Sequence, residues 1–411
     1  MMTEHELSST VISACPLCER SALEVLEPAH DFDSFTTKGD EFTFHIGATS
    51  CAVCGFIFLN PRASQARMYA YYERQSRIPR SLASLGTPFS TLLNLQASFI
   101  RTHWQPPAGA RLLDVGGAEG FFLERLAREV PGGAMCELVE PSTKYAEATR
   151  AVLPGAVIHE CMLEEAPLDR GAFDLVTLRH VMEHVQSPRE ALRIIRRVLK
   201  PTGVLHLELP NVANWTPSVS PMLHHEHLNY FTCDTMAYAL AREGFRPLSL
   251  EAWDDNPELS GFAYPVLRVL AVPADNATAV IPDASDFVAT YRHQADVRRH
   301  FVDNVVGAAS RRIQVLASRG ETLALFGAGP HTLDILHALK LSPSIWTRIL
   351  DNNPNKTGKS MKGIPIVMPS RDVLAGVAAV LISSEQFEGE MAAQVRGFDV
   401  PGLEVITLYA R

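Results

Sequence analysis

From residue 110 to about residue 252, short apolar runs alternate with longer segments whose apolar positions recur at helical spacing. This pattern predicts strands at 110–116, 134–140, 173–181 and 203–211, and helices at 120–130, 144–153, 188–200 and 234–244. Strands and helices that alternate at this spacing form a parallel sheet with right-handed crossovers. The pattern therefore predicts a doubly wound α/β domain in the middle of the chain.

A second, shorter α/β series begins near residue 321. Strands are predicted at 322–330, 346–353, 378–384 and 403–409, and a helix at 331–340. Before the first series, Pro106 and Pro107 followed by Gly109 mark a boundary. We therefore predict an N-terminal module at 12–62, a helical connector at 63–105, the first α/β core at 106–255, a hairpin and helical linker at 256–320, and a Rossmann-like domain at 321–411.

The composition agrees with a globular protein of several domains. A chain of 411 residues is too long for one hydrophobic core, and 46% of its residues are hydrophobic and 20% charged. A formal net charge of −9 argues against a dedicated nucleic-acid binder. Because the sequence has neither an export-type leader nor a run of about 18 apolar residues, we expect a cytoplasmic protein with no membrane partner. Nothing in the sequence predicts its oligomeric state.

Two C-x-x-C pairs stand in the N-terminal module. They are Cys15 with Cys18 and Cys51 with Cys54. This spacing lets two turns present four thiolates tetrahedrally, and four protein ligands predict a structural zinc ion rather than a catalytic one. Two alternatives are buried structural thiols without metal, and His30 or His45 as a substitute ligand.

A glycine-rich turn follows the first strand of the core. The turn and its approach contain Asp114, Gly116, Gly117, Ala118, Glu119 and Gly120. Glycines let a ligand approach the backbone at the carboxyl edge of such a sheet. The spacing resembles the D-x-G-x-x-G first motif of class I methyltransferases more than the G-x-G-x-x-G of dinucleotide enzymes, although a plain structural turn is the alternative.

Further candidate residues for the cofactor follow in the next strands. Glu140 ends the second strand about 20 residues after the turn, where a carboxylate can accept both ribose hydroxyls of a nucleoside. By similarity to class I methyltransferases, residues near Cys161 and Met162 line the adenine. We expect His180, Glu183 and His184 to open the next helix and to border the methionine end of the cofactor. The alternatives are a helix signature without function and an inverted zincin motif.

The predicted catalytic cluster is His224, His225, Glu226 and His227, with Tyr230 just behind it. It follows the strand at 203–211 and so lies beyond a sheet edge. Imidazole is the general base whose unperturbed pKa lies nearest physiological pH, and a neighbouring carboxylate can fix its tautomer. A second metal site and a surface or packing role are the competing interpretations.

The C-terminal domain has its own glycine turn. Gly327, Gly329 and His331 follow the strand at 322–330, and Asp351 ends the next strand. Thr332 stands where a dinucleotide-binding turn has its third glycine, so we expect a structural or substrate-closing role rather than NAD binding. Lys356 or Lys359 could offer a positive charge to an anion.

Together, the paired cysteines, the glycine turn, the His-Glu-His loop and the terminal Rossmann-like domain resemble the three-domain sugar C-methyltransferases. The resemblance implies a class I core that binds S-adenosylmethionine and a structural zinc ion. It also implies C-methylation of a nucleoside-diphosphate-linked keto-deoxysugar, with His227 as base and Glu226 and His225 as supporting residues. Tyr69, Tyr71 or Tyr72 of the connector would reach the sugar. The chain differs from the family in having His224 where a tyrosine usually precedes the loop.

Two other functions remain open on the sequence alone. One is an O- or N-methyltransferase that acts on another small metabolite, in which the loop histidine deprotonates or orients a hydroxyl group. The other is a non-catalytic binding protein that keeps the methyltransferase fold. The sequence does not identify the sugar, the nucleotide or the methylated atom.

Overall fold

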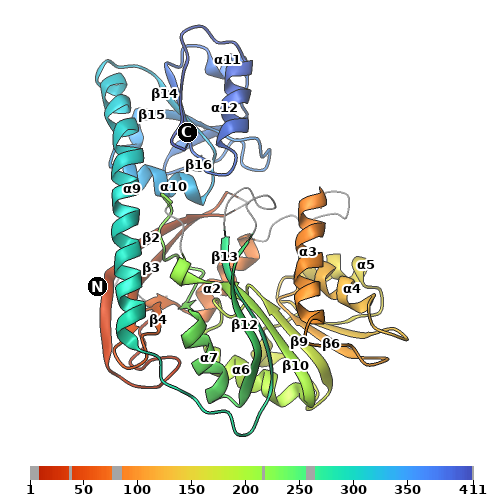
Figure 1. The fold of residues 1–411 in the computed structure, drawn as a ribbon. Coiled ribbons are helices and arrows are strands. Elements are labelled where there is room, and N and C mark those ends of the chain that lie inside the picture. The colour runs from red at the N-terminus through yellow and green to blue at the C-terminus, as the bar shows by residue number, and fades with distance from the viewer. Residues whose placement is uncertain (1–8, 37–38, 76–85, 215–217, 256–263, 410–411) are drawn as a thin grey trace.

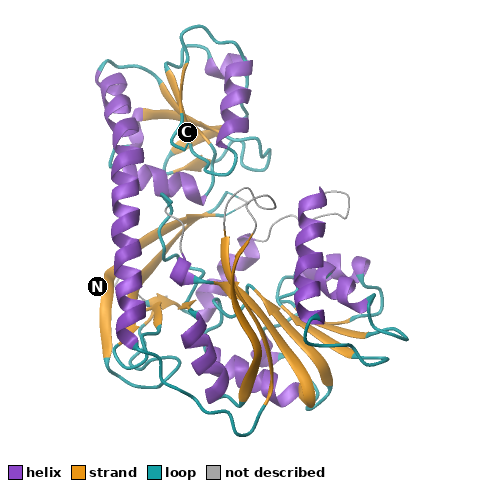
Figure 2. Ribbon diagram, in the orientation of Figure 1, coloured by secondary structure: helices purple, strands orange, loops and turns teal. Residues whose placement is uncertain are grey.

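The computed structural model describes residues 9–36, 39–75, 86–214, 218–255 and 264–409. The connector predicted at 63–105 and the linker predicted at 256–320 therefore include 76–85 and 256–263, which lie outside the described residues. The described chain forms an N-terminal sheet, a central sheet and a C-terminal sheet, and a long helix runs along one side of the molecule (Figures 1 and 2). No described helix is both long enough and apolar enough to cross a membrane.

The central sheet has seven strands in the order β12-β13-β10-β9-β6-β7-β8. Its strands are β6 (Arg111–Val115), β7 (Met135–Val139), β8 (Val157–His159), β9 (Phe173–Arg179), β10 (Leu199–Pro210), β12 (Phe245–Asp255) and β13 (Tyr264–Pro273). β8, β7, β6, β9 and β10 pair in parallel, whereas β13 pairs antiparallel with both β10 and β12. This arrangement confirms the doubly wound α/β fold.

The position of β13 corrects the predicted domain boundary. The segment assigned to the linker from residue 256 contains β13, and this strand inserts between β10 and β12 in the core sheet. Its ladder with β10 joins Leu205 to Ala271 and Pro210 to Val266. The β10 partners of this strand lie far from it in the chain, so no local pattern indicates that the β12–β13 hairpin adds to the core sheet through β13.

Helices cover both faces of the central sheet. They are α3 (Gly86–Arg101), α4 (Phe121–Ala127), α5 (Thr143–Val152), α6 (Pro188–Val198) and α7 (Cys233–Arg242). Along β6 the side chains alternate: Leu112 packs in the cluster with α3 and α4, and Leu113 packs in the cluster with α6 and α7. The helix expected to open at His180 begins instead at Pro188, because Ser187 caps it and proline suits its first turn.

The N-terminal module is a four-stranded antiparallel sheet in the order β11-β4-β3-β2. Its strands are β2 (Leu23–Phe35), β3 (Glu41–Cys51), β4 (Ile57–Leu59) and β11 (Asn229–Tyr230), while β1 (Ser9–Thr10) pairs with β5 (Arg62–Ala63) and α2 (Gln65–Gln75) follows. β11 comes from the central domain and directly follows the His-Glu-His loop. The module and this loop therefore share one sheet.

The C-terminal domain has a six-stranded sheet in the order β16-β17-β15-β14-β18-β19. Its strands are β14 (Leu323–Phe326), β15 (Trp346–Leu350), β16 (Ser360–Met361), β17 (Ile364–Val367), β18 (Ala379–Ile382) and β19 (Glu404–Ile406), and its helices are α10 (Pro330–Leu339), α11 (Arg371–Leu374) and α12 (Glu388–Gly397). Short 3-10 helices lie in the central domain at Leu163–Glu165 and Val212–Asn214, and in the C-terminal domain at Pro343–Ile345. All strand pairs of this sheet are parallel except β16 with β17.

The helix α9 (Ala284–Ser318) joins the two ends of the molecule. Near its start, Phe287 and Tyr291 pack with the core of the N-terminal module, and the Tyr291 hydroxyl donates to Glu27. Near its end, Ile313 and Leu316 pack in the core of the C-terminal domain. In Figure 1 this helix stands beside both domains. It therefore forms a brace between the module and the C-terminal domain.

Candidate active site

The glycine turn lies at the carboxyl end of β6 and is closely packed against neighbouring side chains. An ideal Cβ on Gly117 would come within 2.5 Å of Leu138 Cδ1 and 2.7 Å of Asp114 Oδ2. Gly116 has φ 68°, and a Cβ there would meet Val181 at 2.5 Å. The left-handed backbone at Gly116 therefore favours glycine, whereas a Cβ at Gly117 would displace the side-chain ends of Leu138 and Asp114. The turn also contacts Val181 of the segment that follows β9.

Glu140 lies at the end of β7 beside this turn and is 7% exposed. Its carboxylate accepts hydrogen bonds from the backbone N–H of Ala118 at 3.1 Å and of Ser142 at 2.9 Å. Burial outweighs these bonds and raises the pKa of Glu140 to about 7. No ion pair to Glu140 occurs among the described residues. A nucleoside ribose could supply the donors that its remaining lone pairs lack.

The other carboxylate beneath the turn belongs to Asp114, which is 1% exposed. Its Oδ1 accepts from the Thr177 hydroxyl at 2.6 Å, while Oδ2 has no hydrogen-bond partner within the described part of the chain. Burial raises its pKa, and the positive charge of Arg179 opposes that rise. Asp114, the glycines and Ala118 are thus gathered with Glu140 at one edge, and Glu119, 8% exposed, belongs to the same turn.

Arg179 is a residue of this edge that the sequence analysis did not single out. It ends β9, donates to Gln96 on α3 at 3.0 Å, and holds its guanidinium 3.9 Å from the centre of the Phe122 ring. The only sequence signal for Arg179 was its position at the end of an apolar strand. Cys161 and Met162 are half-buried in the loop after β8, and within the described residues no hydrogen bond joins them to the turn.

His180 follows β9 in a left-handed backbone conformation with φ 53°. Its ring nitrogens lie 3.4 Å from Glu183 and 3.5 Å from Glu208. Desolvation lowers its pKa, but the negative charges of the two nearby glutamates outweigh that effect and raise the pKa to about 10. His180 is therefore an imidazolium at neutral pH. Glu208 is buried and also accepts from Arg268 at 2.6 Å, and these cationic partners hold its pKa well below its usual range.

The His-Glu-His loop is fixed to the segment after β9. The backbone carbonyl of Glu183 accepts from the N–H of Leu228 at 2.7 Å and of Asn229 at 3.1 Å. Across the same junction, His184 Nδ1 lies 2.7 Å from the carbonyl oxygen of Glu226. A carbonyl only accepts, so His184 carries its proton on Nδ1. The loop is thereby held at the edge that also carries the glycine turn.

His227 lies inside a group of imidazoles. Its ring centre is 4.9 Å from that of His184 and 3.9 Å from that of His224. Burial lowers the pKa of His227 well below its ordinary value, and the neighbouring histidines lower it further. Burial likewise lowers the pKa of His224, to about 3. His227 is therefore a neutral imidazole, which has a lone pair that can accept a proton.

His225 faces the N-terminal module instead. It is 3% exposed, stacks on Phe44 with ring centres 4.1 Å apart, and meets the edge of Tyr71 at 4.8 Å. Neither ring nitrogen has a hydrogen-bond partner in the described structure. The side chain thus packs as an aromatic ring between the loop and the module.

The four candidate tyrosines occupy different environments. Tyr72 reaches the histidine cluster, with its hydroxyl 3.2 Å from His184 Nδ1. The Tyr230 hydroxyl accepts from the backbone N–H of His224 at 3.1 Å and so supports the loop. Tyr71 is 1% exposed in the module core, and Tyr69 is 44% exposed. Tyr72 is therefore the tyrosine of the connector that lies beside the cluster.

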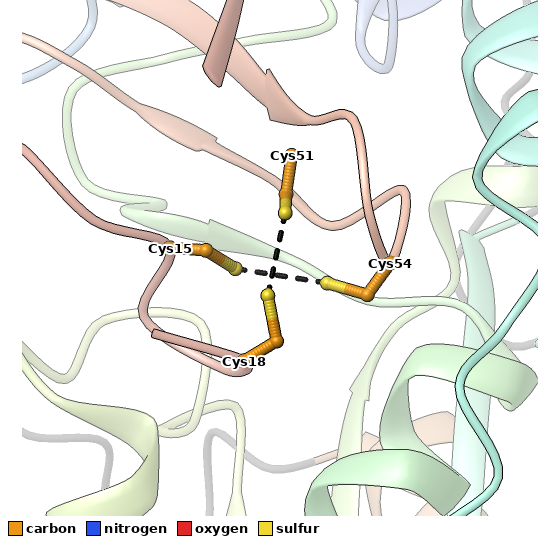
Figure 3. A group of neighbouring side chains, drawn as sticks. All are labelled: Cys15, Cys18, Cys51 and Cys54. Atoms are coloured by element: carbon orange, nitrogen blue, oxygen red, sulfur yellow. Dashed lines mark hydrogen bonds between the residues drawn. The ribbon is translucent and has the colours of Figure 1, made fainter. Parts of the chain in front are cut away.

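The four paired cysteines converge in the N-terminal module, as Figure 3 shows. Cys15 Sγ lies 3.6 Å from Cys54 Sγ, and Cys18 Sγ lies 3.4 Å from Cys51 Sγ. Tetrahedral bonds of about 2.3 Å from zinc to sulfur would place the sulfurs roughly 3.8 Å apart. All four residues are buried and unbridged, so this group fits a zinc ion closely.

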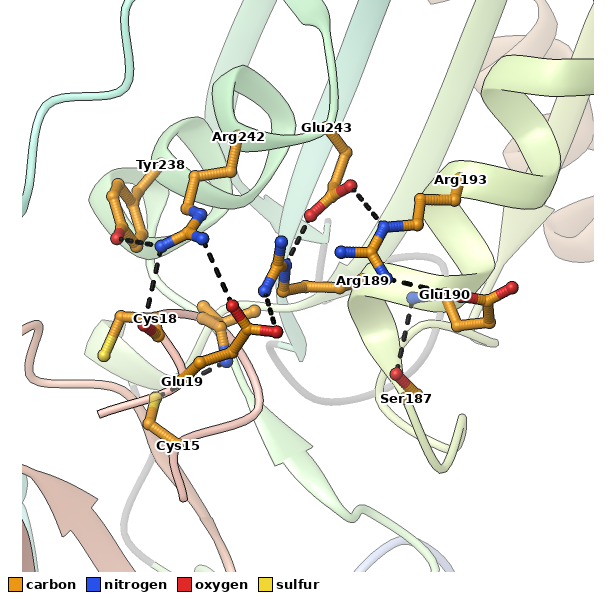
Figure 4. A network of polar contacts seen from close by, with 11 residues as sticks. Cys15, Cys18, Glu19, Ser187, Arg189, Glu190, Arg193, Tyr238, Arg242 and Glu243 are labelled. Atoms are coloured by element: carbon orange, nitrogen blue, oxygen red, sulfur yellow. Dashed lines mark hydrogen bonds and ion pairs between the residues drawn. The ribbon is translucent and has the colours of Figure 1, made fainter. Parts of the chain in front are cut away.

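The loop of the first cysteine pair is joined to the central domain by charges (Figure 4). Glu19 pairs with Arg189 of α6 at 2.6 Å and with Arg242 of α7 at 3.5 Å. Arg189 also pairs with Glu243. A metal ion in the module would therefore order a loop that contacts both helices on one face of the core.

In the C-terminal domain, residues of the same domain bond the polar groups at the glycine turn. Asp351 accepts from the N–H of Ala328 at 2.8 Å and pairs with Lys356 at 3.2 Å. The Thr332 hydroxyl donates to the carbonyl oxygen of Gly327 at 2.7 Å. Lys356 thus already has an anionic partner, whereas Lys359 is exposed.

Comparison with known proteins agrees with this geometry. Residues 90–250 match the family model described as a methyltransferase domain. The chain is 35% identical over 118 residues to a tRNA U34 carboxymethyltransferase of Syntrophotalea carbinolica, covering 28% of this chain and 36% of that protein. It is 30% identical over 133 residues to a ubiquinone biosynthesis O-methyltransferase of Haemophilus ducreyi, covering 30% of this chain and 55% of that protein. The chain thus spans about half or less of the length of these two relatives.

Among solved structures, the chain is similar to a 1,6-didemethyltoxoflavin-N1-methyltransferase of Burkholderia thailandensis with bound S-adenosylhomocysteine. The identity is 14%, the match covers 54% of this chain and 96% of that one, and the TM-score is 0.41. The family match, the strand order and the carboxylates at the glycine turn together define the central domain as a class I methyltransferase domain.

Proposed function

We propose that this protein transfers a methyl group from S-adenosylmethionine to a small-molecule acceptor, with His227 as the general base. The observation that carries this proposal is the junction at the sheet edge. The glycine turn contacts Val181, and two residues further on the Glu183 carbonyl holds the loop that bears His227. The glycine turn that would hold the cofactor and the loop that carries His227 are thus attached to the two ends of one short segment, residues 181–183.

Residues of the turn and its neighbours would hold the cofactor. The glycines leave room for close approach of a ligand, and Asp114 and Glu140 supply buried carboxylates that form no ion pair with another described residue. When bound, S-adenosylmethionine supplies the methyl group of its sulfonium centre. Positioning of the acceptor in line with that group would account for a large part of the rate.

The acceptor that we propose is a nucleoside-diphosphate-linked keto-deoxysugar methylated on carbon. His227 would remove a proton from the carbon next to the carbonyl, and the C–H electron pair would form the enolate. The imidazolium of His180, at the same edge, would stabilise the enolate oxygen. Two groups whose environments push their pKa values apart in this way suit a base and an electrostatic partner. The resemblance in the cysteine, glycine and loop motifs supports the choice of sugar.

O-methylation is the second candidate, because the matched relatives include ubiquinone biosynthesis O-methyltransferases. In that case His227 would take a hydroxyl proton. Exchange with deuterated water separates the two reactions. We would incubate the protein with S-adenosylhomocysteine and a panel of nucleotide-linked keto-sugars in D₂O, and measure deuterium in the recovered sugar by mass spectrometry.

C-methylation predicts deuterium incorporation by the wild-type protein and its loss in His227→Asn. Methyl transfer without exchange would favour O-methylation. Cofactor binding without methyl transfer to any acceptor in a panel of sugars and phenols would favour the non-catalytic alternative.

A further inference from the structure

Three residues of the histidine cluster have the geometry of a second metal site. One ligand atom each of Glu183, His184 and His227 lies within 4.8 Å of the other two. Glu183 and His184 come from the turn between β9 and α6, and His227 comes from the loop that the Glu183 carbonyl holds. This group is separate from the four cysteines, which lie in the N-terminal module.

The carboxylate of Glu183 is the strongest indication of a bound cation. The residue is 1% exposed, and neither carboxylate oxygen has a hydrogen-bond partner in the described structure. Two imidazole nitrogens face it at longer distances, His180 Nδ1 at 3.4 Å and His184 Nε2 at 3.8 Å. A buried carboxylate with such weak partners is costly, and a divalent cation would compensate it.

His184 is oriented as metal-binding histidines usually are. Its Nδ1 proton is directed to the Glu226 carbonyl oxygen at 2.7 Å, with the Tyr72 hydroxyl 3.2 Å away. Its Nε2 therefore carries the lone pair, and this atom is the one on the side of Glu183. A hydrogen bond from the far nitrogen to a carbonyl fixes the tautomer that a metal ligand needs.

We propose that Glu183, His184 and His227 form a second divalent-metal site, which takes a borderline ion such as Zn²⁺ or Co²⁺. Two imidazoles and one carboxylate are a ligand set for such ions, and three protein ligands leave a position open. An ion there occupies the lone pair with which His227 would accept a proton. Metal binding at this site therefore inhibits methyl transfer. The inhibition rests on the proposed role of His227, whereas the site itself does not.

Cobalt titration tests the site directly. The protein is used with its cysteine site loaded with zinc, and Co²⁺ is added while visible absorption is recorded. We expect one further Co²⁺ per chain, with d–d bands and without the strong near-ultraviolet bands of thiolate ligation. Glu183→Gln keeps the side-chain volume and should weaken Co²⁺ binding at least tenfold. Glu226→Gln, which changes a neighbouring carboxylate outside the group, should bind Co²⁺ as the wild type does.

Binding of S-adenosylhomocysteine by both variants serves as the control for folding. The site is disproved if the wild type binds no Co²⁺ beyond the cysteine site, or if Glu183→Gln binds it with unchanged affinity. Methyl transfer is then measured against added Co²⁺ and after chelation. Turnover that falls with Co²⁺ and recovers on chelation supports the inhibition. Turnover that requires the ion would contradict both the inhibition and His227 as base, and would leave the site standing.

Discussion

The central and C-terminal domains begin with the same order of structural elements but differ in the contacts of the acidic residue beside the glycine turn. Each has a strand, a glycine turn, a helix, and a second parallel strand with an acidic residue just beyond it. In the central domain Glu140 accepts two backbone N–H groups, from Ala118 and Ser142. In the C-terminal domain Asp351 accepts from Ala328 and Asn353 and also pairs with Lys356. Glu140 has no ion pair among the described residues, whereas Asp351 pairs with Lys356.

The difference shows that topology alone does not make a nucleotide site. Thr332 and Lys356 satisfy the C-terminal turn from within, so a ligand there would have to displace bonds that already exist. This domain instead contacts the segment that leads to the His-Glu-His loop: Ser220 Oγ lies 2.8 Å from both His331 Nδ1 and Asp334 Oδ2. Arg298 of the brace helix α9 donates to the Ser220 carbonyl oxygen at 2.8 Å. On the proposed function, the central domain would bind the cofactor and the C-terminal domain would support the loop.

The largest effect is expected from replacing His227, beside the central sheet, and it is compared with the replacement of His331 beside the C-terminal sheet. His227→Asn should lower kcat by about 10²- to 10⁴-fold, the usual contribution of a general base, and leave cofactor affinity nearly unchanged. His331→Asn removes a contact that only supports the loop, and should lower kcat by less than about tenfold. Steady-state kinetics and calorimetry on both variants check this. Equal losses in the two would abolish the distinction between the domains.

Zinc removal should affect the loop more than the cofactor site. In Cys51→Ser the module would lose the zinc ion proposed there, whose binding contributes folding free energy, and β11 would lose the sheet that orders the loop. We expect metal content near zero and turnover lowered by roughly 10- to 100-fold, with cofactor affinity changed by less than about threefold. Cys136→Ser, a half-buried thiol of β7, is the matched control. Full metal content in Cys51→Ser would contradict the four-cysteine assignment.

Cofactor affinity should depend on pH through Glu140. Because burial raises its pKa to about 7, the carboxylate that we propose as the acceptor for the ribose hydroxyls is lost as pH falls through 7. The dissociation constant should then rise by about tenfold for each pH unit below 7. Glu140→Gln cannot ionise and should show a flat profile over this range. A wild-type affinity that does not change between pH 5 and 8 would move the ribose contact to another residue.

The smallest expected effect concerns His225. Its ring is enclosed by Phe44 and Tyr71, and its nitrogens make no hydrogen bonds within the described residues. His225→Phe keeps this packing, so turnover should change by less than about threefold. Kinetics of this variant would show whether the loop has one essential imidazole. A loss as large as that of His227→Asn would make His225 part of the chemistry.

Local sequence patterns predicted much of this architecture. Apolar runs located β6, β7, β9 and β10, and the glycines with Asp114 marked the turn, because strand burial and backbone close approach depend on residues near one another in the chain. The paired cysteines predicted a cluster that the structure does bring together.

The local sequence pattern did not predict which strands pair when they are far apart in the chain. The insertion of β13 beside β10 and the addition of β11 to the module sheet join strands that are far apart in the chain. Arg268 and Glu208 are both buried because each compensates the other across 60 positions. His225 also looked like its neighbours in the sequence, and only the aromatic residues around it distinguish its environment.

The central claim is that the first glycine turn, and not the second, binds the cofactor. Calorimetric titration with S-adenosylhomocysteine of the wild type, Glu140→Ala and Asp351→Ala tests this directly. We predict one site per chain in the wild type, an affinity weaker by about 1 to 3 kcal/mol in Glu140→Ala, and unchanged affinity in Asp351→Ala. Unchanged affinity in Glu140→Ala together with weakened binding in Asp351→Ala would contradict the account.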